Sequence, residues 1–131
     1  MQLFVNRPIT AEQLAEVYRR SGIRRLVDDH SRMQRMLENA NLIVTAWGEE
    51  QLIGAARCFC DCGWGCYLSD LAVDRATQCS GIGRALINRA REHIGQQCQL
   101  VLLSAPETLD YYPKVGFEKA HHAFFIRRPL S

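Results

Sequence analysis

The chain has 131 residues and a mass of 14.9 kDa, the size of one domain, so we expect a single domain over residues 1–131. Hydrophobic residues make up 47% of the sequence and charged residues 23%, a balance typical of globular rather than disordered proteins. The formal net charge of +2 is too small to indicate a nucleic-acid partner or an anionic membrane surface.

The sequence also lacks the features of membrane and exported proteins. No apolar run approaches the roughly 18 residues that a membrane span needs. The segment Met1–Thr10 has no apolar stretch like that of a signal peptide. We therefore expect a cytoplasmic protein with neither a membrane nor a nucleic acid as partner.

The first part of the chain predicts a strand over residues 1–7 and then two helices. Thr10 and Gln13 have the spacing of a capping box, and Gly22 is placed to end the first helix. The second helix begins near one of three candidate caps, Asp28, Asp29 or Ser31. Apolar residues at helical spacing predict the buried faces, which are Leu14, Val17 and Tyr18 in the first helix and Met33, Met36, Leu37 and Ala40 in the second.

The rest of the chain predicts a mixed sheet. Three strands over 41–47, 52–60 and 66–73 are joined by turns at 48–51 and 61–65, as in consecutive hairpins. A helix follows with Ile82, Leu86, Ala90 and Ile94 on one face and Gly95 as its cap, then an apolar strand at 100–103. The unit from 66 to 103 is therefore expected to be a parallel crossover. A short helix over 107–114 and two C-terminal strands, broken near His121 and His122, complete the prediction.

Six cysteines occur, but without an export signal they do not indicate a disulfide framework. Zinc sites usually pair cysteines two to four residues apart, and the single-residue spacings here do not fit that pattern. We expect reduced thiols that pack as small hydrophobic groups, with Cys58, Cys60 and Cys62 on one face of a strand. A metal or redox module built on these three and Cys66 is the alternative.

The segment from Gln78 to Arg84 is a small polar loop between an apolar strand and an amphipathic helix. A helix N-terminus exposes unpaired N–H groups that bind phosphate oxygens, and glycines at 81 and 83 let a phosphate approach. Arg84 adds a positive charge in the first turn. Two common phosphate loops are disfavoured, since Leu86 replaces the third glycine of a dinucleotide-binding loop and no Gly-Lys-Ser/Thr run occurs.

Two motifs resemble the GCN5-related N-acetyltransferase (GNAT) superfamily. The first is Gln78-x-x-Gly81-x-Gly83 after Leu71-Ala-Val-Asp74, which is similar to the family's acetyl-CoA signature. The second is Asp110-Tyr111-Tyr112-Pro-Lys-Val-Gly116-Phe117, which is similar to its late aromatic and Gly-Phe motif. The resemblance covers nearly the whole chain. It implies an α/β (α+β) fold with a mostly antiparallel sheet, a splayed central pair of parallel strands, and flanking helices.

The resemblance implies that acetyl-CoA is the co-substrate and that no metal takes part. Pantetheine would lie between the splayed strands against the backbone of Leu71, Ala72 and Val73. The pyrophosphate would lie on the loop and helix start. The loop residues concerned are Gln78, Cys79, Ser80, Gly81, Ile82, Gly83 and Arg84, with Ser104 and Tyr111 as further cofactor contacts.

Tyr112 matches the family tyrosine that protonates the leaving thiolate of CoA in direct transfer from a ternary complex. Asp70 faces the expected acetyl position and is a candidate base, although it can equally orient a neighbour or bind a backbone group. His30, His121 and His122 are alternative bases. An oxyanion donor is expected from the backbone of the strand over 66–73.

The acceptor pocket is expected between residues 21–31, the turn at 61–64 and the C-terminal hairpin. Asp28 and Asp29 are candidate contacts for a cationic amine, Trp64 is a candidate wall, and the arginines at 19, 20, 24 and 25 are interpreted as a solvated helix end. A small primary amine is favoured over a protein amine as acceptor. A non-catalytic CoA-binding sensor or partner-binding domain is the competing hypothesis, and either a monomer or a homodimer is expected.

Overall fold

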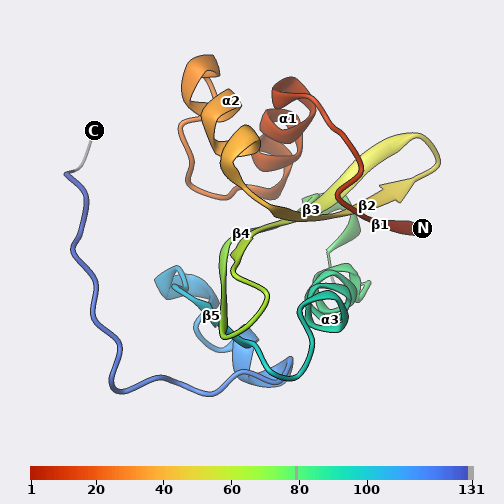
Figure 1. The fold of residues 1–131 in the computed structure, drawn as a ribbon. Coiled ribbons are helices and arrows are strands. Elements are labelled where there is room, and N and C mark those ends of the chain that lie inside the picture. Colours follow the sequence, from red (N-terminus) through yellow and green to blue (C-terminus); the bar gives the residue numbers. More distant parts are fainter. Residues whose placement is uncertain (79, 130–131) are drawn as a thin grey trace.

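The computed structural model describes residues 1–78 and 80–129, and its centre is one five-stranded sheet (Figure 1). The strands lie in sequence order and are β1 (Gln2–Val5), β2 (Leu42–Gly48), β3 (Gln51–Cys60), β4 (Gly65–Val73) and β5 (Gln99–Leu102). The first four pair antiparallel, and β4 pairs with β5 in parallel. The predicted mixed, mostly antiparallel sheet is confirmed, although β1 is shorter than the strand expected over residues 1–7.

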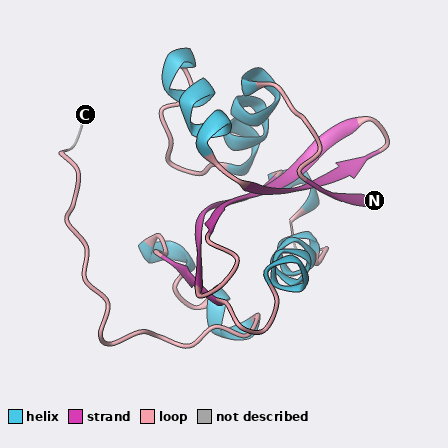
Figure 2. Ribbon diagram, in the orientation of Figure 1, coloured by secondary structure: helices cyan, strands magenta, loops and turns pink. Residues whose placement is uncertain are grey.

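Helices cover both faces of the sheet (Figure 2). One face carries α1 (Ala11–Ser21) and α2 (His30–Asn39), and the other carries α3 (Ile82–Ile94). Thr10 and Gln13 form both bonds of the predicted capping box, and the Gly22 cap has the left-handed φ of 79° that ends α1. Of the three candidate caps for α2, Asp29 is the one whose carboxylate accepts from the Arg32 N–H.

The two faces of the sheet bury separate hydrophobic clusters, as the periodicity of the helices predicts. The cluster under α3 contains Leu86, Ile87 and Ala90, packed on alternate residues of β2, β3 and β4. The cluster under α1 and α2 contains Leu14, Tyr18 and Met33. The β-strands therefore present side chains alternately to the two helical layers, and the sheet centre is covered on both sides.

Four of the cysteines lie in this interior. Cys58, Cys60, Cys66 and Cys98 all belong to the cluster under α3, and burial raises the pKa of Cys58 to about 12. All four are free cysteines that pack in the core, as expected. The expectation that Cys62 shares their face is wrong, because β3 ends at Cys60 and Cys62 lies exposed in the following turn at φ 61°.

The parallel pair β4–β5 is joined over only half of β4. Four pairs from Gly65↔Gln99 to Leu68↔Leu102 form the ladder, and the register of β4 against β3 shifts directly after Leu68. The shift leaves Ser69 as an extra residue, a β-bulge that bends the strand. From Asp70 to Val73, β4 pairs with β3 alone among the described residues.

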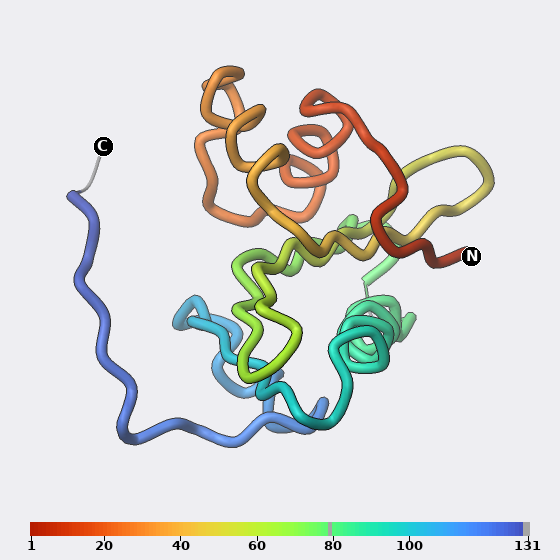
Figure 3. Tube along the Cα trace, viewed as in Figure 1, coloured from red at the N-terminus to blue at the C-terminus, as the bar shows by residue number. Residues whose placement is uncertain are grey.

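The C-terminal part differs from the prediction. The expected helix over 107–114 is two short pieces, a 3₁₀ turn η2 (Pro106–Thr108) and α4 (Tyr111–Lys114). The two expected C-terminal strands are wrong, because residues 117–129 form neither a helix nor a strand. In the tube view this segment leaves the body after α4 and runs outside it (Figure 3). Its apolar run at residues 123–126 is rich in residues that favour strands, but within the described chain no neighbouring strand pairs with it.

Candidate functional site

The divergence of β4 and β5 leaves the backbone of β4 accessible on one side. The predicted cofactor contacts Leu71, Ala72 and Val73 lie in this stretch, and their other side is held by β3 at Ala56, Ala55 and Gly54. Backbone N–H and C=O groups at a strand edge need partners, and an extended chain entering the gap would supply them. The predicted splayed pair of strands is therefore present, beginning at the bulge.

The glycine loop lies where β4 leads into α3. The sequence from Asp74 passes through the 3₁₀ turn η1 (Arg75–Thr77), and α3 begins after Gly81. Gly81 has a φ of 84°, and a Cβ there would meet no described atom within 4 Å. No side chain among the described residues caps the N-terminus of α3, so the first N–H groups of the helix have no side-chain acceptor there. This arrangement fits a bound phosphate.

The remaining loop residues are held by local hydrogen bonds. The Gln78 side chain donates to the Val73 carbonyl at 3.0 Å, and the Ser80 hydroxyl donates to the Thr77 carbonyl. These hydrogen bonds hold the Gln78 and Ser80 side chains within the loop. The backbone atoms of the two residues then line it. Cys79, which the sequence also assigned to the cofactor, lies outside the described residues.

Other predicted cofactor contacts have different surroundings. Arg84 donates to the Lys114 carbonyl at 3.0 Å, which ties α3 to α4. The Ile82 side chain is buried under the sheet, so only its backbone faces the loop. Ser104 lies just beyond β5, where its hydroxyl is 3.0 Å from the Thr108 hydroxyl. It therefore flanks the end of the strand gap from the β5 side.

Gly83 brings the two sequence motifs together. A Cβ at this position would lie 2.5 Å from Tyr111 Oη and 3.9 Å from Leu71 Cδ2. The glycine of the loop, the strand of the acetyl-CoA signature and the first tyrosine of the late motif therefore meet at one point. A Cβ here would force the Tyr111 hydroxyl to shift, because real Cβ atoms do not approach other atoms so closely.

Tyr112 lies half-buried beside this point. Its ring packs edge-on against Tyr111 and Phe117, with centroids 5.2 and 5.6 Å away. Burial raises the pKa of the Tyr112 hydroxyl, Tyr111 raises it further, and the Arg25 guanidinium opposes the rise. The hydroxyl therefore stays protonated at neutral pH. None of the described residues forms a hydrogen bond with it, so it is available to a ligand.

Asp70 accepts hydrogen bonds from three side chains. Its Oδ2 accepts from Tyr18 Oη at 2.7 Å and from Arg57 Nε at 2.6 Å, and its Oδ1 accepts from Arg25 Nε at 2.6 Å. Asp70 as a whole residue is 1% exposed. Both oxygens are thus engaged by strong donors on α1, β3 and the α1–α2 connection, so Asp70 joins three parts of the fold at the bulge.

Asp70, Tyr18, Arg25 and Arg57 together form what we call the Asp70 cluster. The charges in this cluster disfavour Asp70 as a base. Burial alone would raise the pKa of its carboxyl, but the Arg25 and Arg57 guanidinium groups outweigh burial and hold the pKa below its usual range. Tyr18 remains protonated, because burial and the Asp70 charge both raise its pKa. A carboxylate that is already stabilised by two cations has little affinity for the proton of an amine. The geometry favours the other predicted role, the orientation of neighbours.

Arg25, Arg57 and Tyr18 were not identified from the sequence as site residues. Arg25 in particular is no solvated helix end, since it lies beyond α1 and also donates to the Ser69 carbonyl at 3.1 Å. One sequence signal was available for Arg57. It is a lone cation in an apolar strand, and the hairpin around Gly63 places it opposite the lone carboxylate of the next strand.

The alternative bases and amine contacts lie in other positions. His30 begins α2, and His121 and His122 lie exposed on the C-terminal segment, where residues 117–129 form no strand. Asp29 serves as the cap of α2, and Asp28 pairs with Arg19 at 3.0 Å. These contacts give both carboxylates a structural role.

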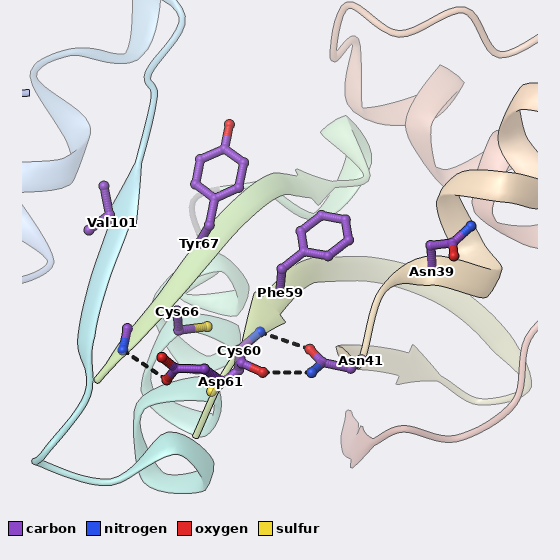
Figure 4. Close-up of a pocket in the computed structure, with 9 residues that line it drawn as sticks. Asn39, Asn41, Phe59, Cys60, Asp61, Cys66, Tyr67 and Val101 are labelled. Atoms are coloured by element: carbon purple, nitrogen blue, oxygen red, sulfur yellow. Dashed lines mark hydrogen bonds between the residues drawn. The ribbon is translucent and has the colours of Figure 1, made fainter. Parts of the chain in front are cut away.

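A cavity of about 520 Å³ opens on the α2 side of β3, β4 and β5 (Figure 4). The rings of Phe59 and Tyr67 lie side by side in its wall, and these residues and Val101 are direct neighbours across the three strands. The Arg57 guanidinium lies 5.3 Å above the Phe59 ring, so the cavity adjoins the Asp70 cluster. Its polar wall consists of Asn39, Asn41 and Asp61.

No cluster of three or more His, Cys, Asp or Glu residues in the ranges 1–78 and 80–129 is arranged to hold a metal ion. No helix in the same ranges is long and apolar enough to cross a membrane.

Comparison with known proteins identifies the family of the chain. No curated protein sequence matches the chain. Its fold matches a protein of unknown function from meticillin-resistant Staphylococcus aureus (TM-score 0.78, 20% identity, 97% of this chain and 100% of that one). It also matches a GNAT-family acetyltransferase from Streptococcus pneumoniae (0.73, 20%, 98% and 98%). A third match is AAC(6′)-Iy in complex with the bisubstrate analogue CoA-S-monomethyl-acetylneamine (0.70, 17%, 99% and 100%). The model of the acetyltransferase (GNAT) domain matches residues 12–127, and the chain therefore belongs to the GNAT acetyltransferase family.

Proposed function

We propose that this protein transfers the acetyl group of acetyl-CoA to a primary amine of a small molecule, by direct attack in a ternary complex. The observation that carries the proposal is the open edge of β4 from Ser69 to Val73, which leads directly into the uncapped N-terminus of α3. An extended pantetheine arm needs the first feature and a pyrophosphate needs the second.

The described residues fit this co-substrate. At Gly81 the space that a side chain would take is open, which leaves room for phosphate oxygens. Near Gly83 the Tyr111 hydroxyl and the Leu71 side chain close the other side of the gap. The neighbour AAC(6′)-Iy, in complex with a bisubstrate analogue of CoA, supports a CoA thioester as donor.

Tyr112 is the proposed acid. A thiolate leaves when the tetrahedral species collapses, and a neutral phenol donates a proton or a hydrogen bond to it. Arg25 exerts an electrostatic effect on the Tyr112 hydroxyl, and its positive charge favours negative charge that develops nearby. Asp70 is proposed to act through Arg25 as a positioning residue, because it fixes the guanidinium by a 2.6 Å hydrogen bond.

The cavity beside Phe59 and Tyr67 is the proposed acceptor site. It adjoins the Asp70 cluster, and its volume of about 520 Å³ is in the range of small-molecule sites. Its aromatic and carboxamide groups suit a small amine better than a long peptide. Tyr67→Ala is expected to raise the KM for the amine and to leave the Kd of acetyl-CoA unchanged.

Calorimetric titration with acetyl-CoA, and separately with NADH and ATP, tests the donor site without knowledge of the amine. We expect binding of acetyl-CoA alone. Gly81→Asp is expected to weaken this binding about tenfold or more, a loss of about 1.4 kcal/mol, through repulsion of the pyrophosphate. Gly81→Asn is the matched control, since it has the same size and the same backbone strain without the charge.

Turnover is then measured as free CoA released with a panel of amines, with products identified by mass. Release of CoA with an acetylated amine supports the enzyme. Binding of acetyl-CoA without release for any amine, small or on a protein, would favour the competing hypothesis of a non-catalytic sensor. No binding of acetyl-CoA would contradict the proposal.

A further inference from the structure

Asp61 is the one charged residue among the described residues that line the cavity of about 520 Å³ (Figure 4). Its Oδ1 accepts from the N–H groups of Gly63, Trp64 and Gly65 at 2.9, 2.8 and 3.0 Å. Hydrogen bonds from these three backbone groups, that of Trp64 above all, lower the pKa of Asp61 to about 2. The carboxylate is therefore ionised at neutral pH.

The second oxygen of this carboxylate has no partner in the described part of the chain. No group in residues 1–78 and 80–129 donates to Asp61 Oδ2, and no cation there pairs with the exposed side chain. The adjoining end of β3 is held by Asn41, which donates to the Cys60 carbonyl at 2.6 Å and accepts from the Cys60 N–H at 2.8 Å. One end of the cavity therefore carries a fixed negative charge that a cation on a ligand would neutralise.

The opposite end of the cavity lies beside an excess of positive charge. The Arg57 guanidinium lies 5.3 Å above the Phe59 ring, and Arg57 shares the single carboxylate of Asp70 with Arg25. Two cations against one anion leave a net positive charge there. Such surroundings lower the pKa of an ammonium group, and an amine must be neutral before it attacks a thioester. This end therefore favours the reacting amine, whereas the Asp61 end favours a cation that does not react.

An apolar stretch of strand separates the two ends. The Asp61 N–H donates to the Gly65 carbonyl, so the alternation of β3 continues as far as Asp61. Arg57, Phe59 and Asp61 therefore lie on the same side of the sheet, with the Phe59 ring between the two charged groups. Tyr67 continues the aromatic wall on β4. Four residues of strand span about 13 Å, so a ligand that reaches both ends needs an apolar stem of similar length.

We propose that the acceptor is an elongated dication, in which an apolar stem joins the reacting primary amine to a second cationic group that pairs with Asp61. This inference rests on the proposed function, since it names the substrate class of the same cavity. An extended chain advances about 1.2 Å per bond, so the two nitrogens of octamethylenediamine lie about 11 Å apart. That diamine nearly spans the strand distance, whereas trimethylenediamine, with nitrogens about 5 Å apart, reaches one end only.

Binding of octamethylenediamine, measured by calorimetry without acetyl-CoA, tests the cation site apart from any turnover. Asp61→Asn keeps a side-chain oxygen for the three backbone N–H groups and removes only the charge. We expect this variant to raise the Kd of the diamine about three- to fivefold, the effect of one exposed ion pair. Undetectable binding to the unaltered protein would overturn the inference.

Glu50→Gln is the matched control for the loss of one negative charge. Glu50 is exposed and lies directly before β3, at the opposite end of the strand from Asp61. We expect its diamine Kd to equal that of the unaltered protein. Equal weakening in both variants would show a general attraction between the diamine and the protein charge, and would also overturn the inference.

Turnover tests which end of the ligand reacts. At saturating acetyl-CoA, Asp61→Asn is expected to lower kcat/KM for octamethylenediamine about three- to fivefold. The same variant should leave kcat/KM for octylamine unchanged, because the single amine of octylamine reacts only from the Arg57 end and kcat/KM does not register unproductive binding. Trimethylenediamine is expected to resemble octylamine. Equal losses for all three amines would contradict a bridging dication.

The two measurements distinguish failure of this inference from failure of the proposed function. Diamine binding that depends on Asp61, without acetylation of any amine, would confirm the cation site and contradict the transferase. Acetylation of octylamine or another monoamine, together with diamine binding that is the same in Asp61→Asn, would support the transferase and overturn the dication as its substrate class.

Discussion

Arg57 and Asp70 face each other from adjacent strands, with the Arg57 Nε 2.6 Å from Asp70 Oδ2 and side chains only 6% and 0% exposed. The pair lies at the β4 bulge, where the strand gap begins. A buried pair of this kind contributes little net stability, but loss of one partner leaves a buried charge uncompensated. Asp70 therefore connects β4 with α1, β3 and the α1–α2 connection at this site.

Asp70→Asn is expected to lower the free energy of unfolding by about 3–5 kcal/mol, because Arg57 would remain buried without its counter-charge. Urea unfolding followed by tryptophan fluorescence measures the loss. Asp74→Asn is the matched control just after the end of β4, where the carboxylate caps η1 and pairs with the more exposed Arg20. A loss no larger than that of the control would contradict the role of the cluster.

Acid stability depends on the same carboxylate. The pKa of Asp70 is lowered in the folded protein, so the unfolded chain takes up the proton first as the pH falls. The stabilisation is present above the unfolded pKa of about 3.9 and is lost as the pH falls through the folded value.

Arg25→Gln removes one of the two cations and is therefore expected to move the acid unfolding midpoint to higher pH. The control is the neighbouring Arg24→Gln, since Arg24 is mostly exposed and lies 3.7 Å from Glu107. Circular dichroism during acid titration measures both midpoints. Equal midpoints for the two variants would show that Arg25 does not set the titration of Asp70.

Much of this fold follows from local sequence patterns. Thr10 and Gln13 mark the start of α1 because a capping box satisfies two backbone groups by itself, and the Ile82, Leu86 and Ala90 stripe marks the buried face of α3. The glycine loop was located for the same reason, since the strand, the loop and the helix are contiguous in sequence.

The features that sequence patterns missed depend on contacts between distant residues. The bulge at Ser69 arises from the register between two strands, and Arg25 reaches Asp70 from a connection 45 residues earlier. The two C-terminal strands predicted around the break at His121 and His122 are absent, because residues 117–129 form no strand. A strand also needs a partner edge, and a sequence pattern does not show where that edge is.

Tyr112→Phe is expected to lower kcat about 100-fold or more, the range of a lost general acid, with the Kd of acetyl-CoA nearly unchanged. Tyr111→Phe removes the equivalent hydroxyl oxygen from the preceding residue and is the control. We expect its effect on kcat to be at least tenfold smaller. Steady-state kinetics with the amine found in the screen, combined with calorimetry, separate the two effects. Similar losses of kcat in both variants would contradict the assignment of the acid.

Gly83 and Tyr111 give a prediction that couples the two motifs. Gly83→Ala is expected to weaken acetyl-CoA binding, because its Cβ would lie 2.5 Å from Tyr111 Oη and force the ring to shift. Removing that oxygen with Tyr111→Phe relieves the clash, so the double variant should bind more tightly than Gly83→Ala alone. Calorimetry of the four proteins forms a double-mutant cycle. Additive effects would mean that the two residues do not meet, and the convergence of the two motifs at this point would then be wrong.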